Sequence, residues 1–192
     1  MIDLTKHILP DTVEVNGETY KIETDYTYWI RFSQIAKDRK AKITDFDFIY
    51  IGKTKAFNII DRNPPKDRVA GFLALLGFYQ PKEECPKADE DDGDGERALD
   101  YTVDGSRIYA AFMQCYGINL IRTPMHWHEF LALLQNVRGT MLNDVMGYRL
   151  WEKPSGEKNA YENGMERLKE LWELPPTEEE KETLERFNSR FD

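Results

Sequence analysis

The sequence predicts a mainly α-helical fold: a helical domain with a small N-terminal β-hairpin and a helical C-terminal extension. Apolar residues recur at the helical spacing i, i+3, i+4, i+7 in several segments. An Asn-Gly pair separates two short segments of strand character, the pattern of a tight hairpin. From Pro154 onward the chain is charged and polar, yet it keeps a helical spacing. We therefore expect a main domain over residues 1–153 and an extension over residues 154–192, which has too few apolar residues for a core of its own.

The N-terminal part begins with the predicted hairpin, over residues 13–22. Asn16 and Gly17 supply the two positive-φ positions that a type I′ turn requires. Asp25 is expected to cap the helix that follows. The apolar face of that helix is formed by Trp29, Phe32, Ser33 and Ala36. The run 45–51 fits a strand by its alternation and a helix by its longer spacing, and we favour the helix.

Two central helices carry the same start and stop signals. Asn63-Pro64-Pro65 opens the first, because proline suits the first turn of a helix, and Gly77-Phe78 closes it. Asp104 opens the second, and Gly117-Ile118 closes it in the same way. The expected buried face of the first helix is Val69, Phe72, Leu73 and Leu76. The expected buried face of the second is Ile108, Ala111, Phe112 and Cys115, with Tyr109 beside them.

The remaining segments are more polar. Residues 83–96 hold eight acidic residues and one lysine, which predicts a solvated loop. In the extension, Tyr161, Met165, Leu168 and Trp172 keep a helical spacing up to Pro175-Pro176. Residues 177–180 then have the pattern of a capping box, which predicts the start of a second short helix.

Composition excludes several classes of protein. The net charge of −9 would repel nucleic acid, whose binding needs clustered Lys and Arg. No apolar run approaches the roughly 20 residues that cross a bilayer, and the start of the chain lacks the features of a signal peptide. We therefore expect no nucleic-acid or membrane partner. Cys85 lies in the charged loop and Cys115 on a helical face, so we expect no disulfide and a reducing cytoplasm.

The segment around two neighbouring histidines is where a metal or catalytic site would be expected. Thr123 is predicted to cap a helix, with Pro124 in its first turn. His126 and His128 diverge by about 200° on a helix, so they cannot easily share a metal ion. His126 and Glu129 share a face, but two ligands fall short of the three or four that zinc takes. We expect one packed and one exposed histidine here, and no metal.

No other constellation supports an enzyme. The acidic residues 90–95 loosely follow the spacing of a calcium-binding loop, but Tyr101 stands where the bidentate glutamate belongs. The sequence contains no P-loop, no Gly-x-Gly-x-x-Gly and no Gly-x-Ser-x-Gly pattern. We therefore predict a protein that is not an enzyme and has no cofactor.

Large side chains in the C-terminal region are the candidates for partner binding. They are Trp151, Trp172, Tyr161, Met165 and Leu168. A large aromatic residue in so polar a segment either clamps the segment onto the main domain or anchors a partner. For the two tryptophans the clamp is favoured, and the anchor stays open.

Four blocks of the sequence occur in a familiar order: residues 104–112, 116–120, 125–134 and 147–149. With the hairpin, they resemble a family of small proteins from long-tailed, non-contractile phages and prophages of Gram-positive bacteria. The resemblance covers residues 13–152. Its structural signature is His126, Trp127, Phe130 and Leu134, preceded by Ile108, Tyr109 and Phe112. This chain departs from the family at His128, where a second tryptophan is expected, and that departure weakens any metal hypothesis further.

The resemblance implies a role in tail assembly. Members are usually encoded between the tail tube protein and the tape measure protein. The chain is then expected to be a non-enzymatic assembly chaperone of the host bacterial cytoplasm, absent from the mature virion. Its expected partners are the tape measure protein, the tail tube protein or both, and homo-oligomerisation is left open. The alternatives are an acidic decoy that mimics DNA and a metal-dependent enzyme built around His126 and Glu129.

Overall fold

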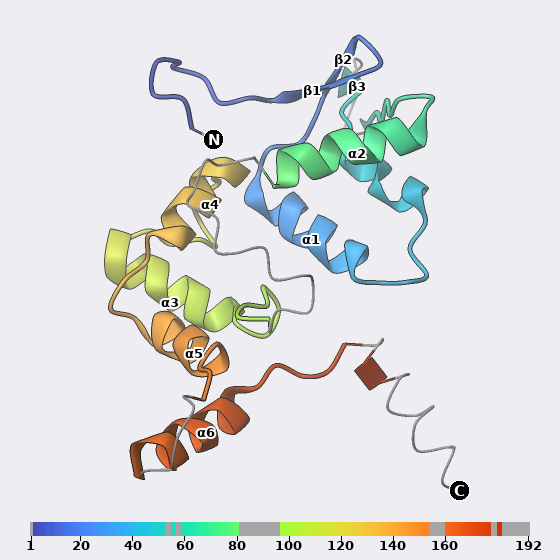
Figure 1. Ribbon diagram of the computed structural model, residues 1–192. Coiled ribbons are helices and arrows are strands. Elements are labelled where there is room, and N and C mark those ends of the chain that lie inside the picture. The colour runs from blue at the N-terminus through green and yellow to red at the C-terminus, as the bar shows by residue number, and fades with distance from the viewer. Residues whose placement is uncertain are drawn as a thin grey trace, which may run out of the picture. The chain divides into compact units, whose positions relative to one another are not determined.

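The computed structural model describes residues 2–52, 55–56, 59–80, 97–153, 160–177 and 180–181. It confirms a mainly α-helical fold with a small β-hairpin near the N-terminus (Figure 1). The acidic segment 83–96, with Cys85 and the residues that resemble a calcium-binding loop, lies outside the described residues.

The chain divides into two compact units. The first unit comprises residues 1–87 and 120–136, and the second unit comprises residues 88–119 and 137–192. The predicted boundary between residues 153 and 154 falls within the second unit. The division of the chain into a main domain and an extension at residue 153 stays a prediction.

The first unit begins with the hairpin of β1 (Thr12–Val15) and β2 (Glu18–Lys21), which pair antiparallel. Asn16 has φ 52° and Gly17 has φ 80°, so the predicted turn is confirmed. Val13 and Val15 are buried, and the hairpin lies against α2 (Arg68–Tyr79) (Figure 1). This contact supplies the support that a two-stranded hairpin needs. A second antiparallel pair consists of β3 (Lys55–Ala56) and β4 (Ile59–Ile60).

The helix predicted after the hairpin is α1 (Tyr26–Ala36), and Asp25 caps it as expected. The Asp25 carboxylate accepts the N–H of Thr27 at 3.0 Å. Three of the four predicted face residues are buried, whereas Ala36, the last residue of the helix, is exposed. The ambiguous run 45–51 is helical, as favoured, but in the tighter 3₁₀ form: η1 (Ile43–Ile49) buries Phe46 and Ile49.

The predicted ends of α2 are wrong. The helix begins at Arg68, after Pro64-Pro65, because the Asp67 carboxylate accepts the N–H of Ala70 at 3.0 Å and acts as the N-cap. It continues to Tyr79, so Gly77 lies inside it and takes no left-handed conformation. The start of this helix is therefore set by the Asp67 side chain, and the two prolines precede the helix.

The predicted buried stripe of α2 is wrong at two of its four positions, whereas Phe72 and Leu76 are half-buried. Val69 and Leu73 are 57% and 61% exposed, and the buried positions are Gly71, Leu75 and Phe78. The reason is that α2 is apolar on nearly every side, so spacing alone cannot select its inner face. Close packing makes the selection instead: a Cβ added to Gly71 would lie 2.5 Å from the Pro65 side chain.

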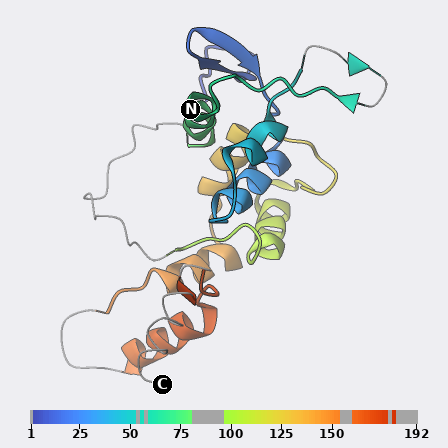
Figure 2. The same cartoon turned by 90° about the vertical axis from the view of Figure 1, so that its right-hand side faces the viewer.

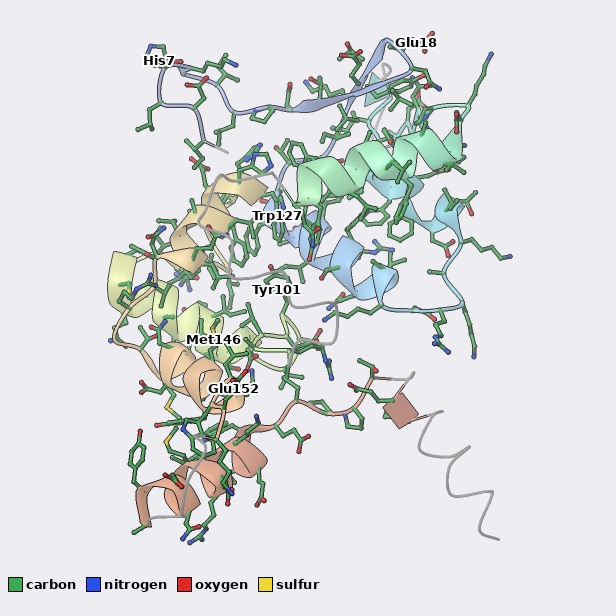
Figure 3. All side chains as sticks on the ribbon, viewed as in Figure 1. His7, Glu18, Tyr101, Trp127, Met146 and Glu152 are labelled. Carbon is green, nitrogen blue, oxygen red and sulfur yellow. The ribbon has the colours of Figure 1, made fainter. Side chains whose placement is uncertain are left out.

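Aromatic side chains form the core of the first unit, where α4 (Trp127–Gln135) meets α1 and the end of α2. Trp127 is fully buried, and its ring stacks on Tyr79 with centroids 5.2 Å apart (Figure 3). Its indole N–H donates to the Tyr79 carbonyl at 2.9 Å. Trp29, also fully buried, donates to the Glu23 carbonyl at 2.9 Å. Both large rings are thus packed without an unsatisfied N–H.

The second unit contains α3 (Gly105–Tyr116), α5 (Met141–Arg149) and α6 (Ala160–Trp172). The predicted end of α3 is confirmed, since Gly117 has φ 67° and the N–H of Ile118 donates to the Phe112 carbonyl at 3.3 Å. Ile108, Ala111 and Phe112 are buried as predicted.

The prediction that Cys115 is a core residue is wrong, because its side chain is exposed. Cys115 lies in the last turn of α3, beside the loop that precedes α5. Its thiol donates to the Arg138 carbonyl of that loop at 3.6 Å. The helical spacing is therefore correct, but the packing surface ends one turn before the helix does.

A buried ion pair connects the helices of the second unit. Arg149, the last residue of α5, donates to the Asp104 carboxylate through Nη1 at 2.6 Å and Nη2 at 3.0 Å. The Asp104 side chain is 0% exposed and that of Arg149 is 4% exposed. Arg149 also donates to the Trp172 carbonyl at 2.7 Å and to the Ala98 carbonyl at 2.9 Å. One guanidinium thus binds the start of α3 and the end of α6.

The predicted C-terminal elements are present where the structure describes them. The helical spacing of the extension is confirmed by α6. The predicted capping box is also confirmed: the N–H of Glu180 donates to the Thr177 hydroxyl at 3.2 Å, and the Glu180 carboxylate accepts the N–H of Thr177. Among the helices of the described ranges, none has the length and apolar character that a membrane crossing needs.

The substitution Arg149→Met tests the ion pair. It leaves the Asp104 carboxylate buried without its main partner, so we expect the free energy of unfolding to fall by about 3–5 kcal/mol. Urea denaturation followed by circular dichroism measures this change. The control is Arg122→Met, at an exposed arginine of the first unit. Equal losses in the two variants would contradict the importance of the pair.

The same pair predicts a pH dependence. Burial raises the pKa of Asp104, but hydrogen bonds from Arg149 and the Asp100 N–H, with the charges of Arg149 and Arg107, lower it more. The net pKa lies below the usual value, so this stabilisation is present above a pH of about 4 and is lost as the pH falls through the folded-state pKa. We expect the stability difference between the wild type and Asp104→Asn to shrink from pH 7 to pH 3. A constant difference would contradict this.

Candidate partner-binding site

The two neighbouring histidines have structural roles in the first unit. The prediction that Thr123 and Pro124 start the helix is wrong, because α4 begins at Trp127 with His126 as its N-cap. His126 Nδ1 accepts the N–H of His128 at 3.1 Å, and the Glu129 carboxylate accepts the N–H of His126 at 3.3 Å. The two side chains form a capping box in which an imidazole replaces the usual hydroxyl.

Backbone pairing explains why the helix starts late. The N–H of Trp127 donates to the Thr24 carbonyl at 2.7 Å, and the N–H of Tyr26 donates to the Met125 carbonyl at 2.9 Å. The residues before α4 therefore run antiparallel to the residues before α1, with a bridge between Asp25 and His126. An extended segment that is paired in this way cannot also be the first turn of a helix.

The geometry at these histidines supports packing rather than metal binding. His126 Nε2 lies 2.9 Å from the Pro10 carbonyl, so both ring nitrogens of His126 are bound to the backbone. His128 is buried, with Nε2 2.9 Å from the Phe78 carbonyl. Within the residues that the structure describes, no three His, Cys, Asp or Glu side chains are grouped to hold a metal ion. His7 lies in the N-terminal arm (Figure 3).

The signature residues of the sequence blocks lie in the cores of the two units. In the first unit, Trp127 and Phe130 are fully buried and Leu134 is half-buried. In the second unit, Ile108 and Phe112 are buried and Tyr109 is half-buried. Trp127, Phe130, Ile108 and Phe112 therefore pack the cores of the two units.

Trp172 and the backbone carbonyl of Trp151 take part in the contacts that hold α6 in place. The Arg107 guanidinium lies 4.6 Å from the centre of the Trp172 ring, a cation–π contact, and Arg149 binds the Trp172 carbonyl. Lys169 of α6 donates to the Trp151 carbonyl at 3.0 Å. Helix α6 lies alongside α5 (Figure 2). Trp172 thus contacts residues of α3 and α5, and its role as a clamp or as a partner anchor stays a prediction.

The remaining candidates lie on α6 with different exposures. Tyr161 is 70% exposed, while Met165 and Leu168 are half-buried. Leu171, which the sequence analysis did not select, is 72% exposed. At 100° per residue, Tyr161, Leu168 and Leu171 lie within about 80° of one another. These three residues form an apolar surface that we call the α6 strip. Its spacing i, i+7, i+10 is a sequence signal that could have identified Leu171.

The capping role of His126 makes a testable prediction. His126→Ala removes the acceptor for the His128 N–H, so we expect the free energy of unfolding to fall by about 1 kcal/mol. His126→Asn keeps an acceptor at the N-cap and should lose less. Urea denaturation measures both variants, with and without added Zn²⁺. A zinc-dependent rise in the free energy of unfolding that disappears in His126→Ala would contradict the capping role and support a metal site.

The family of the chain follows from its sequence pattern. Residues 5–174 match the family described as Bacteriophage Gp15 protein. The match includes the hairpin and every helix from α1 to α6, and thus extends over both units. No curated protein and no solved structure matches the chain. The match confirms the phage origin that the sequence blocks indicated. The chain belongs to the bacteriophage Gp15 protein family.

Proposed function

We propose that this protein is a non-enzymatic assembly chaperone for the tail of a long-tailed phage of Gram-positive bacteria. It binds the tape measure protein, the tail tube protein or both in the host cytoplasm, and it is absent from the mature virion. Membership of a bacteriophage family supports a phage role. The sequence blocks that resemble a family of phage tail-assembly proteins support a role in the assembly of the tail.

The observation that carries the proposal is the exposed α6 strip. Large aromatic side chains are common anchors of protein interfaces, and here Tyr161 is exposed together with Leu171 on a helix whose other exposed residues are mostly polar. A tape measure protein is expected to be a long helical rod with an apolar stripe. A helix that presents apolar residues at i, i+7 and i+10 suits such a stripe, because helix-to-helix recognition reads that spacing.

The absence of an enzymatic activity is part of the proposal. His126 and Glu129 serve as a helix cap, so the pair that suggested a metal-dependent enzyme already has a structural role. The net charge of −9 fits a carrier that keeps an apolar client in solution. The same charge also favours the second candidate, an acidic decoy that mimics DNA and captures basic host proteins.

Co-expression with the tape measure and tube proteins of the same phage tests the proposal. We expect a soluble complex that contains the tape measure protein under conditions in which that protein alone precipitates. Size-exclusion chromatography with light scattering measures the complex and its stoichiometry. If the tape measure protein aggregates unchanged, the proposal fails. Capture of basic host proteins that is lost as salt is raised would support the decoy instead.

Variants of α6 test whether the strip is the contact. The double substitution Tyr161→Asp with Leu171→Asp places charges on two exposed positions, so the fold should be retained while the complex is lost. Asn163→Asp is the control for an added charge on this helix, because Asn163 is exposed and lies about 140° from Leu168, the middle residue of the strip by angle. Equal complex formation by the double variant and the control would exclude the α6 strip as the contact.

A further inference from the structure

A second surface of the second unit is a groove between α3 and the start of α5. Its volume is about 440 Å³. The residues that line it on the α3 side are Val103, Ser106, Arg107, Ala110, Ala111 and Gln114, and those on the α5 side are Thr140, Met141 and Leu142. We call this surface the α3–α5 groove. It shares only Arg107 with the contacts that hold α6.

Five of the described residues that line the groove are apolar: Val103, Ala110, Ala111, Met141 and Leu142. Val103 on the α3 side and Met141 on the α5 side are 41% and 48% exposed. Between them, Ser106 and Ala110 are exposed small residues one helical turn apart on α3. Small side chains at this spacing allow a second helix to approach closely, while the flanking residues fill the spaces between its side chains. The shape therefore suits an α-helix that lies across α3.

Among the described residues that line the groove, the one with a charge is the basic residue Arg107. Asp104 is shared by two arginines: Arg149 binds it with two nitrogens, and Arg107 Nη1 lies 3.1 Å from its Oδ1. Arg107 is the exposed partner, with 27% of its side chain accessible against 4% for Arg149. Both hydrogen bonds that Arg107 makes with described residues use Nη1. The other two guanidinium nitrogens are therefore donors for an incoming carboxylate.

We propose that the α3–α5 groove binds an amphipathic α-helix of another protein, with aliphatic side chains between Val103 and Met141 and a carboxylate on Arg107. A strand is a poorer occupant, because the described residues of the second unit contain no strand edge on which a peptide could pair. A second copy of this chain is disfavoured by the repulsion between two proteins of charge −9. This inference does not depend on the identity of the phage client.

Designed helical peptides test the groove on the full-length protein. The first peptide has a leucine stripe at i, i+3, i+4, i+7 and one glutamate beside it. The second has lysine in place of the glutamate, and the third has the composition of the first with its leucines scrambled. Fluorescence anisotropy measures the Kd of each. We expect the glutamate peptide to bind at least about tenfold more tightly than the lysine peptide, because only the glutamate accepts a charge-assisted hydrogen bond from Arg107.

This comparison is stringent because the net charge of −9 attracts the lysine peptide and repels the glutamate peptide. Ala110→Trp fills the centre of the groove at an exposed position and should weaken binding of the glutamate peptide at least about tenfold. Ala36→Trp, at an exposed helical alanine of the first unit, is the matched control and should have no effect. Arg107→Gln should abolish the preference for glutamate over lysine while leaving the leucine-dependent affinity.

Three results would overturn the inference. They are equal binding of the glutamate and lysine peptides, equal binding of the scrambled peptide, and unchanged binding by Ala110→Trp. A dimer of the wild-type chain that Ala110→Trp converts to a monomer would assign the groove to a second copy instead. Circular dichroism melts of each variant exclude a loss of folding as the cause. Failure here leaves the co-expression result unaffected, because that experiment uses the tape measure and tube proteins of the phage and not the designed peptides.

Discussion

The buried pair of Asp104 and Arg149 is the interaction on which the second unit depends. Arg149 ends α5, its partner Asp104 precedes α3, and its Nε binds the last carbonyl of α6. The α6 strip and the α3–α5 groove are therefore both positioned by one guanidinium. A buried ion pair costs desolvation energy and adds little net stability compared with an apolar core. Its geometric demand is strict, however, so we infer that it fixes how the three helices are arranged.

Sequence patterns predicted the turns and helix ends that are determined by residues close together in the chain. Asn16-Gly17 specifies a type I′ turn, Asp25 caps the start of α1, and Gly117 ends α3. Each of them acts on backbone atoms only a few residues away. The start of α4 could not be predicted in this way. It depends on pairing between the residues before α4 and those before α1, about a hundred positions earlier in the chain. The inner face of α2 was also beyond the pattern, because an all-apolar helix gives no periodic signal.

The candidate partner-binding residues show the same difference between features that local spacing predicts and features that tertiary contacts decide. The helical spacing correctly placed Tyr161, Met165, Leu168 and Trp172 on one helix, but it could not sort packed from exposed members. Trp172 is held by Arg107 and Arg149, and neither contact leaves a mark in the sequence near Trp172. Leu171 was within reach of the pattern, since it follows Leu168 at i+3. The prediction selected Trp172 because it is a large aromatic residue. The neighbouring Leu171 is the more exposed of the two, at 72%.

The two surfaces of the second unit differ in electrostatic character, and this difference bears on selectivity. The α6 strip lies on a helix of mixed charge, whereas the groove presents Arg107 in a protein of charge −9. A partner with a carboxylate is repelled at long range and bound only at contact, so it must also supply apolar area. A basic partner is attracted at long range but gains no bond to Arg107. Such opposition slows association and limits affinity, which suits the proposed chaperone, because a client that binds too tightly could not be passed on to the growing tail.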